Sequence, residues 1–366
     1  MKYICKNCGK TQDVNSIIMY CECGGLWSLD FDTPRFDPSI IDKDIWGLFR
    51  YRAFLPVKDG YWEKTTLGEG MTPIVRIDNH VLLKMDYCMP TLSFKDRGTA
   101  VLMTHLMSLG VESVVQDSSG NAGNSVAAYA AKLGIDCEIY VPEGASIQKI
   151  NMIRAHGAKC IVVPGSRDNC ANVCRSKAET EGLVYASHVI NPFFYQGTKT
   201  YIYEIYEQLG RIPPTIFVPI GNGTLFLGIM IGLEELLASG CISKMPKIVG
   251  VQSEYCDPLV AAYRAHETNP CEVQTMSTLA EGIAIGKPMR GAEIMEYVYK
   301  HDVELITAPE SKIIDARKML AKKGIYCEHT SAAIYSAYLN YADRYGDQIM
   351  GDILIPMCGA GLKSDH

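Results

Sequence analysis

Short apolar runs alternate with amphipathic stretches over the middle of the chain. The runs read as buried strands, and in the longer stretches apolar residues recur at helical spacing. The expected strands are 114–116, 137–141, 160–163 and 183–186, and the expected helices are 124–133, 147–156 and 169–181. Gly134 and Gly157 follow two of these helices, where glycine commonly ends a helix. This order predicts a parallel sheet covered by helices.

A second set of the same kind follows, and one earlier strand is expected at residues 81–85. The further strands are expected at 215–220, 247–252, 303–307 and 352–357, and the helices at 197–209, 225–238, 311–323 and 331–341. The fold class is therefore α/β. The pattern separates a small α/β domain, 106–200, from a large domain, 28–105 with 201–366. Residues 1–27 stand apart from both.

Composition narrows the class of protein. The 366 residues are 48% hydrophobic and 21% charged, which is ordinary for a soluble globular protein with a sizeable core. The net charge is −6 and no Lys/Arg tract stands out, so neither nucleic acid nor a membrane is an expected partner. The most apolar stretch, 216–232, contains Pro219, Asn222 and four glycines. It therefore reads as a strand, a turn and a helix rather than a membrane span.

The cysteines point to a reducing compartment and to one metal site. The beginning of the chain, Met1–Cys5, is too polar for a signal peptide, and fourteen cysteines then suggest reduced thiols in the cytoplasm. Two pairs, Cys5-x-x-Cys8 and Cys21-x-Cys23, lie twelve residues apart. Such spacing suits a tetrahedral structural zinc in a small ribbon. The alternative is four reduced cysteines that bind no metal.

A lysine at a helix start is the first candidate for chemistry. In the segment Pro90–Gly98, a turn precedes a helical run, Ser93 can cap the helix, and Lys95 falls in the first turn. The positive end of the helix dipole favours loss of the lysine proton, which must precede attack on a carbonyl. The alternative is a solvated cluster formed by Lys95, Asp96 and Arg97.

Two glycine-containing loops are candidates for anion binding. The segment Asp117–Ser125 joins a strand to a helix, where open backbone N–H groups can bind an anion; a tight turn with a serine cap is the alternative. Gly221–Thr224 is a second such loop. Ile229 stands where a P-loop needs lysine, and Leu227 stands where a dinucleotide fingerprint needs glycine. A single phosphate monoester fits this loop better.

Together these segments resemble a known family. Pro90–Gly98 and the segment Gly68–Pro73 are similar to motifs of pyridoxal phosphate enzymes of the tryptophan synthase β-like family (fold type II), and within it to threonine synthase-like enzymes. Leu92 departs from the usual Pro-Thr-Gly-Ser-Phe-Lys-Asp-Arg-Gly. The likeness, over about 5–363, implies two parallel-sheet, three-layer domains, the large one binding the cofactor. It also implies a zinc-ribbon-like segment at 1–27 and a homodimer.

The resemblance assigns roles to the candidate residues. Lys95 would bind pyridoxal 5′-phosphate as a Schiff base and then serve as general base. Asn121 would contact the 3′-oxygen of the ring, and Cys358, a weak neutral partner, would lie beside the pyridine nitrogen. The remaining cofactor-binding residues would be Gly221, Asn222, Gly223, Thr224 and Gly282. The substrate carboxylate would be bound by Ser118, Ser119, Gly120, Asn121 and Ala122.

Three departures from the family pattern fall on the substrate side. In the segment Asn191–Gly197, Phe194 replaces an arginine that is usual in threonine synthases, and Ala122 and Ala360 replace a threonine and a histidine. The loss of the arginine removes a charge-assisted donor for a phosphate. Other cations that could replace it are Lys149, Arg154 and Lys199.

The first choice of function is nevertheless conversion of O-phosphohomoserine and water to threonine and phosphate. The alternative is a β-elimination or β-replacement enzyme that acts on another amino acid. That group contains diaminopropionate ammonia-lyase, serine/threonine dehydratase and O-phosphoserine-dependent enzymes such as cysteate synthase. A non-catalytic binding protein of the same fold is the alternative of another class.

Overall fold

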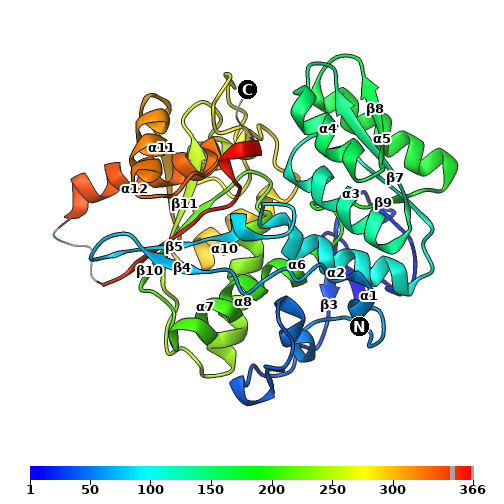
Figure 1. The fold of residues 1–366 in the computed structure, drawn as a ribbon, viewed down its shortest axis with the longest axis horizontal. Coiled ribbons are helices and arrows are strands. Elements are labelled where there is room, and N and C mark those ends of the chain that lie inside the picture. Colours follow the sequence, from blue (N-terminus) through cyan, green and yellow to red (C-terminus); the bar gives the residue numbers. More distant parts are fainter. Residues whose placement is uncertain (347–350, 364–366) are drawn as a thin grey trace. The chain divides into compact units, whose positions relative to one another are not determined.

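The computed structural model describes residues 1–346 and 351–363. The chain divides into two units (Figure 1): Met1–Gly70 with Met89–Thr198, and Met71–Cys88 with the described residues from Lys199 onward. The division expected from the sequence, with a large domain over 28–105 and 201–366, stays a prediction. Within the described ranges, no helix combines the length and the hydropathy needed to cross a membrane.

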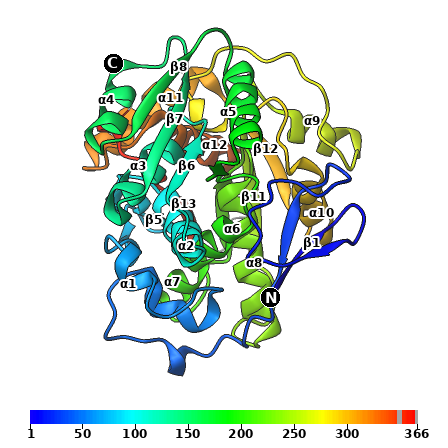
Figure 2. The same ribbon diagram turned by 90° about the vertical axis from the view of Figure 1, so that its right-hand side faces the viewer.

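A four-stranded parallel sheet organises the first unit, as the alternating pattern predicts. Its order is β8-β7-β6-β9, and the strands are β6 (Ser113–Gln116), β7 (Asp136–Pro142), β8 (Lys159–Val163) and β9 (Val184–Tyr185). The helices are α1 (Trp62–Thr65), α2 (Lys95–Ser108), α3 (Asn121–Leu133), α4 (Ile147–Ala155), α5 (Arg167–Glu181) and α6 (Phe193–Thr198). Figure 2 shows α5 on one side of this sheet and α3 and α4 on the other.

A small antiparallel sheet at the N-terminus packs against α2 and α6. It consists of β1 (Lys2–Cys5), β2 (Thr11–Gln12) and β3 (Trp27–Asp30), in the order β2-β1-β3. The ring of Tyr3 meets the ring of Phe193 edge-on at 6.2 Å, and the imidazole of His105 stacks on Phe193 at 3.6 Å. Buried aromatic packing therefore joins this segment to the helix that begins at Lys95.

The second unit contains a six-stranded sheet in the order β12-β11-β10-β13-β5-β4. The strands are β4 (Ile74–Arg76), β5 (Val81–Lys84), β10 (Thr215–Pro219), β11 (Lys247–Ser253), β12 (Glu304–Ala308) and β13 (Ile353–Pro356). All neighbours are parallel except β4, which runs antiparallel to β5. The expectation of a purely parallel sheet is corrected here. The short connection between β4 and β5 permits only a hairpin, because a parallel crossover needs a dozen or more residues.

The helices of the second unit follow the expected order with two additions. They are α7 (Thr200–Leu209), α8 (Thr224–Ala238), α9 (Pro258–Ala265), α10 (Gly291–Lys300), α11 (Ile313–Lys322) and α12 (His329–Tyr345). Helices α9 and α10 were not expected from the sequence. The single helix expected at 197–209 is two helices, α6 and α7, with a break at Lys199.

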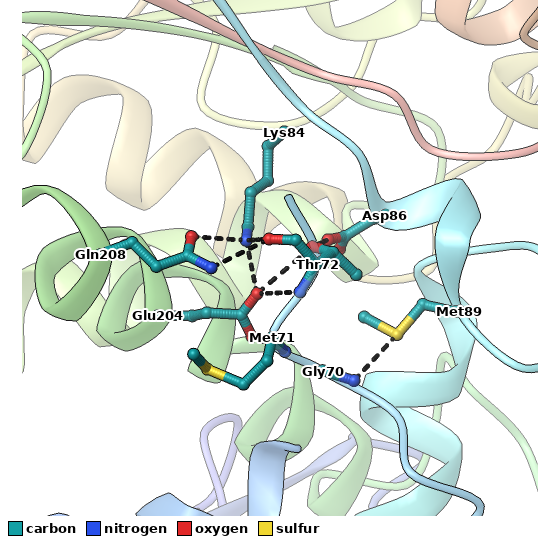
Figure 3. Close-up of polar contacts among 8 residues, drawn as sticks. All are labelled: Gly70, Met71, Thr72, Lys84, Asp86, Met89, Glu204 and Gln208. Carbon is teal, nitrogen blue, oxygen red and sulfur yellow. Dashed lines mark hydrogen bonds and ion pairs between the residues drawn. The ribbon is translucent and has the colours of Figure 1, made fainter. Parts of the chain in front are cut away.

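A fully buried ion pair connects β5 to α7. The Lys84 ammonium donates to the Glu204 carboxylate, to the carbonyl oxygen of Thr72 at 2.6 Å and to Oε1 of Gln208 at 3.0 Å (Figure 3). Glu204 also accepts from the backbone N–H groups of Met71 at 2.8 Å and Thr72 at 2.7 Å. The pair therefore fixes the segment before β4 through its backbone as well as through charge.

Candidate functional site

Lys95 is the first residue of α2, in the first turn as expected. Its side chain is half-buried, and its ammonium lies 4.5 Å from the ring centroid of Phe94 and 5.9 Å from that of Phe194. The expectation that Ser93 caps the helix is wrong. Phe94 is the N-cap residue, and the buried Ser93 hydroxyl has no hydrogen-bond partner.

The turn before Lys95 is held by Asp96. The Asp96 carboxylate accepts from the backbone N–H of Thr91 at 2.7 Å, from the Thr91 hydroxyl at 2.5 Å and from the Ser125 hydroxyl at 2.5 Å. Leu92, the departure from the usual glycine, has φ of 62°, in the left-handed region that glycine adopts more easily. Asp96 thus anchors a strained turn to α3. Because Asp96 follows Lys95 at the start of α2, these contacts also position Lys95.

The candidate carboxylate loop is shorter than expected because α3 begins at Asn121 rather than at 124. Asn121 is therefore the first residue of the helix, and Ala122 lies inside it. Glycine is required at position 123, because a Cβ there would lie 1.8 Å from the carbonyl oxygen of Ser118. The Ser118 hydroxyl accepts from the Gly120 N–H at 3.2 Å. The close loop-to-helix approach brings 118–122 together at one helix N-terminus.

Phe194 is fully buried against α2. A Cβ on Gly98 would lie 2.4 Å from its ring, so the ring fills the space beside that glycine. Of the three cations that could replace the missing arginine, Lys199 is fully buried and pairs with Glu235 at 2.8 Å, which makes it a poor candidate. Arg154 is exposed, and Lys149 is half-buried.

The candidate phosphate loop lies between β10 and α8. Gly223 is the N-cap residue of α8 with φ of 76°, and Thr224 is the first residue of the helix. A Cβ on Gly221 would lie 3.1 Å from the carbonyl oxygen of Gly282 and one on Gly223 2.5 Å from Ile294. Small residues thus leave the backbone amides at the start of this helix open, which suits a phosphate.

Residues of α12 join Gly282 and Cys358, which were predicted separately. The Gly282 N–H donates to the Thr330 hydroxyl at 3.1 Å, and the Cys358 N–H donates to the Ser331 hydroxyl at 2.8 Å. The Cys358 side chain is buried, whereas Glu281 beside Gly282 is exposed. The sequence analysis missed these two hydroxyls, which hold the backbone of the two candidate ring contacts.

A buried carboxylic acid lies in the Gly68–Pro73 segment. The Glu69 carboxylate accepts from the Leu67 N–H at 2.8 Å, from the Tyr129 hydroxyl at 2.7 Å and from the Thr66 hydroxyl at 3.1 Å. Burial raises the pKa of Glu69 to about 7, although the hydrogen bonds from Tyr129 and Leu67 act in the opposite direction. Glu69 thus changes its charge near neutral pH inside the first unit.

The pKa of Glu69 predicts a pH-dependent stability. Because it lies above the unfolded value of 4.5, the folded chain binds more protons between pH 4.5 and 7, and stability falls as pH rises through that window. At about 1.4 kcal/mol for each unit between the two pKa values, the loss is of the order of 3 kcal/mol. In Glu69→Gln, chemical denaturation across this pH window should show that the free energy of unfolding no longer falls in this way. The exposed Glu63→Gln serves as control, and an unaltered pH profile in Glu69→Gln would contradict the assignment.

Comparison with known families gives one match over most of the chain. A family model described as pyridoxal-phosphate dependent enzyme matches residues 65–359. The chain is 35% identical to threonine synthase of Methanocaldococcus jannaschii over 344 residues, which cover 90% of this chain and 84% of that protein. It is 31% identical to threonine synthase of Mycobacterium leprae, over 86% of this chain and 87% of that protein.

Solved structures share the fold at lower identity. A processed form of threonine deaminase isoform 2 from Solanum lycopersicum superimposes with a TM-score of 0.71 at 21% identity, over 90% of this chain and 95% of that chain. A fungal L-serine ammonia-lyase from Rhizomucor miehei gives a TM-score of 0.69 at 22% identity, over 79% and 93% of the two chains. These structures support the α/β architecture that the sequence predicts.

Proposed function

Because the chain belongs to the family of pyridoxal-phosphate dependent enzymes, we propose that it converts O-phosphohomoserine and water to threonine and phosphate. The observation that carries this proposal is the 35% identity to a threonine synthase across 90% of the chain. An amino-acid substrate, which the sequence predicts, is consistent with this similarity. A cytoplasmic location and a homodimer stay predictions of the sequence.

The residues present fit pyridoxal 5′-phosphate. Lys95 would hold the aldehyde carbon covalently, and Asn121 would contact the ring. The phosphate would be bound at the start of α8 by Gly221, Asn222, Gly223 and Thr224, where a Cβ on either of the two flanking glycines would meet neighbouring atoms within about 3 Å. Gly282 and Cys358 would contact the ring. When bound, the cofactor supplies an electron sink for a negative charge formed at the substrate α-carbon.

The protein's own groups would carry the remaining steps. The Lys95 amine, once released from the cofactor, would remove the α-proton as general base. The loop Ser118–Ala122 would bind the substrate carboxylate at the N-terminus of α3, and within it the Gly120 N–H is held by the Ser118 hydroxyl. Asp96 takes no part in proton transfer in this scheme. It holds the turn in which Lys95 begins the helix.

Phe194 favours a second candidate function. A buried phenyl ring donates no hydrogen bond to a phosphate, so a β-elimination or β-replacement enzyme for another amino acid is the competing proposal. The deciding assay offers O-phosphohomoserine, O-phosphoserine, 2,3-diaminopropionate, serine and threonine separately, and follows threonine, phosphate, ammonia and 2-oxo acid. Phosphate with threonine from O-phosphohomoserine supports the first proposal. Ammonia and pyruvate from serine or diaminopropionate, without turnover of O-phosphohomoserine, would replace it with the second.

We further propose that residues 1–27 bind a structural zinc ion. The ligand atoms of Cys5, Cys8, Cys21 and Cys23 lie within 4.8 Å of one another, and two of the sulfur–sulfur distances are 3.5 and 3.6 Å. A tetrahedral zinc with bonds of about 2.3 Å requires sulfurs about 3.8 Å apart. A Cβ on Gly25 would lie 2.7 Å from the Cys5 sulfur, so glycine permits this approach.

Zinc content gives a direct test of this second proposal. The dialysed protein should retain about one zinc per chain, because a closed site of four thiolates releases its metal slowly. Cys8→Ser should lose the metal, whereas Cys88→Ser, at an exposed cysteine outside the cluster, should keep it. Elemental analysis of the three proteins measures this. Less than about a third of an equivalent in the unmodified protein counts against the site.

A further inference from the structure

His188 is a buried histidine connected to the candidate carboxylate loop. It lies between β9 and α6, and 8% of its surface is exposed. Its Nδ1 is 3.3 Å from Nε2 of Gln116, the last residue of β6. The side-chain oxygen of Gln116 in turn accepts from the backbone N–H of Ser118 at 2.5 Å. One amide group therefore links the imidazole to the backbone of the loop.

Gln116 fixes the position of the imidazole proton. Because its oxygen accepts from the Ser118 N–H, the amide nitrogen faces His188 and can only donate. Nδ1 is then the acceptor, and the proton of the neutral imidazole lies on Nε2. Burial lowers the pKa of His188 well below its usual value, and the positive charges of Lys95 and Arg167 lower it further. His188 is thus a neutral ring with one N–H donor at Nε2.

The ring of Phe194 is a common neighbour of His188 and Lys95. The imidazole centroid lies 5.9 Å from the Phe194 centroid in an edge arrangement, and the Lys95 ammonium lies 5.9 Å from the same ring. Phe194 itself has no polar atom to offer, and Lys199 is engaged with Glu235. His188 therefore carries an N–H donor on a side chain that shares the Phe194 ring as a neighbour with Lys95.

We propose that His188 recognises a phosphate group on the side chain of the amino-acid substrate, its Nε2–H donating to a phosphate oxygen. The inference rests on the proposed function, since it names a residue that binds the same phosphorylated substrate. It is a binding role, and no proton is transferred. A neutral imidazole is a weaker partner for a phosphate than a guanidinium, but it adds no positive charge beside Lys95.

Paired ligands test this role on the holoenzyme. O-phosphohomoserine is compared with homoserine, and O-phosphoserine with serine, by titration of the cofactor absorbance. His188→Phe, which keeps a ring but removes the donor, should weaken both phosphorylated ligands about ten- to a hundredfold and their partners less than about threefold. His188→Gln, which retains an N–H donor, should keep most of the preference. His105→Phe, at a buried histidine stacked on Phe193, should change neither.

Two outcomes would overturn the inference: equal weakening of both members of each pair in His188→Phe, or no weakening. His188→Ala gives the same comparison if the larger ring prevents folding. The proposed function fails separately. Suppose that the unmodified enzyme makes no threonine but prefers phosphorylated ligands, and that His188→Phe lacks this preference. The inference then stands and threonine formation is wrong. If threonine is made and the preference survives the substitution, the inference is wrong and the function stands.

Discussion

Lys95→Ala is expected to lose covalent attachment of the cofactor and to lower turnover by about 10²- to 10⁴-fold or more. A positioned general base typically contributes about 10²- to 10⁴-fold, and loss of the covalent link adds to it. Lys95→Arg should be equally inactive, because arginine keeps the positive charge but does not lose its proton. The amino group, rather than the charge, is then the property that matters at the start of α2.

Borohydride reduction followed by peptide mapping measures the covalent link. The unmodified protein should carry the pyridoxyl label on Lys95, and Lys132→Ala, at an exposed lysine on α3, should be labelled at Lys95 to the same extent. Label on another lysine, or full turnover by Lys95→Ala, would remove Lys95 from the mechanism. Circular dichroism separates these results from a loss of folding.

The apolar pattern was sufficient for the parallel strands of the two large sheets, but not for the antiparallel strand β4 or for the helix starts. The buried runs of the parallel strands are short, apolar and bounded by turn residues, so their positions follow from local sequence. Ser93 was expected to cap α2 from residue type alone. In the structure, the Asp96 carboxylate accepts a hydrogen bond from the Thr91 N–H, and Leu92 adopts the left-handed conformation in the turn. Phe94 is then the N-cap residue. A propensity rule does not contain these tertiary contacts.

The same limit applies to the candidate site. Lys95, Asn121 and the loop at Gly221 could be proposed from the sequence because each lies within a short motif, and their roles stay predictions. His188 was missed because its role depends on Gln116, 72 residues away in the chain. Lys199 could be offered as a phosphate donor because its partner, Glu235, lies one helix later. Pairings between distant residues decide both cases, and a single sequence does not record them.

Lys84→Met is expected to lower the free energy of unfolding by about 3–5 kcal/mol, the usual loss when one partner of a buried ion pair is removed. Lys84 and Glu204 are both fully buried, so the substitution leaves the Glu204 carboxylate without the ammonium that compensates it (Figure 3). The carbonyl oxygen of Thr72 also loses its 2.6 Å donor. Denaturant unfolding measures the loss. Lys159→Met is the control, because Lys159 is 66% exposed and its pair with Glu138 should contribute about 0–1 kcal/mol.

A double-mutant cycle separates the ion pair from the packing of the lysine stem. Glu204→Gln removes the negative charge and keeps one side-chain oxygen, which can still accept from one of the N–H groups of Met71 and Thr72; the loss of the other acceptor is common to the single and the double variant and cancels in the cycle. The double variant Lys84→Met/Glu204→Gln should therefore lose less stability than the two single variants together, by about 1–3 kcal/mol. If the two losses simply add, the charges are not coupled and the cost of Lys84→Met comes from packing. Coupling in the expected range would show that charge compensation holds the segment before β4 on α7.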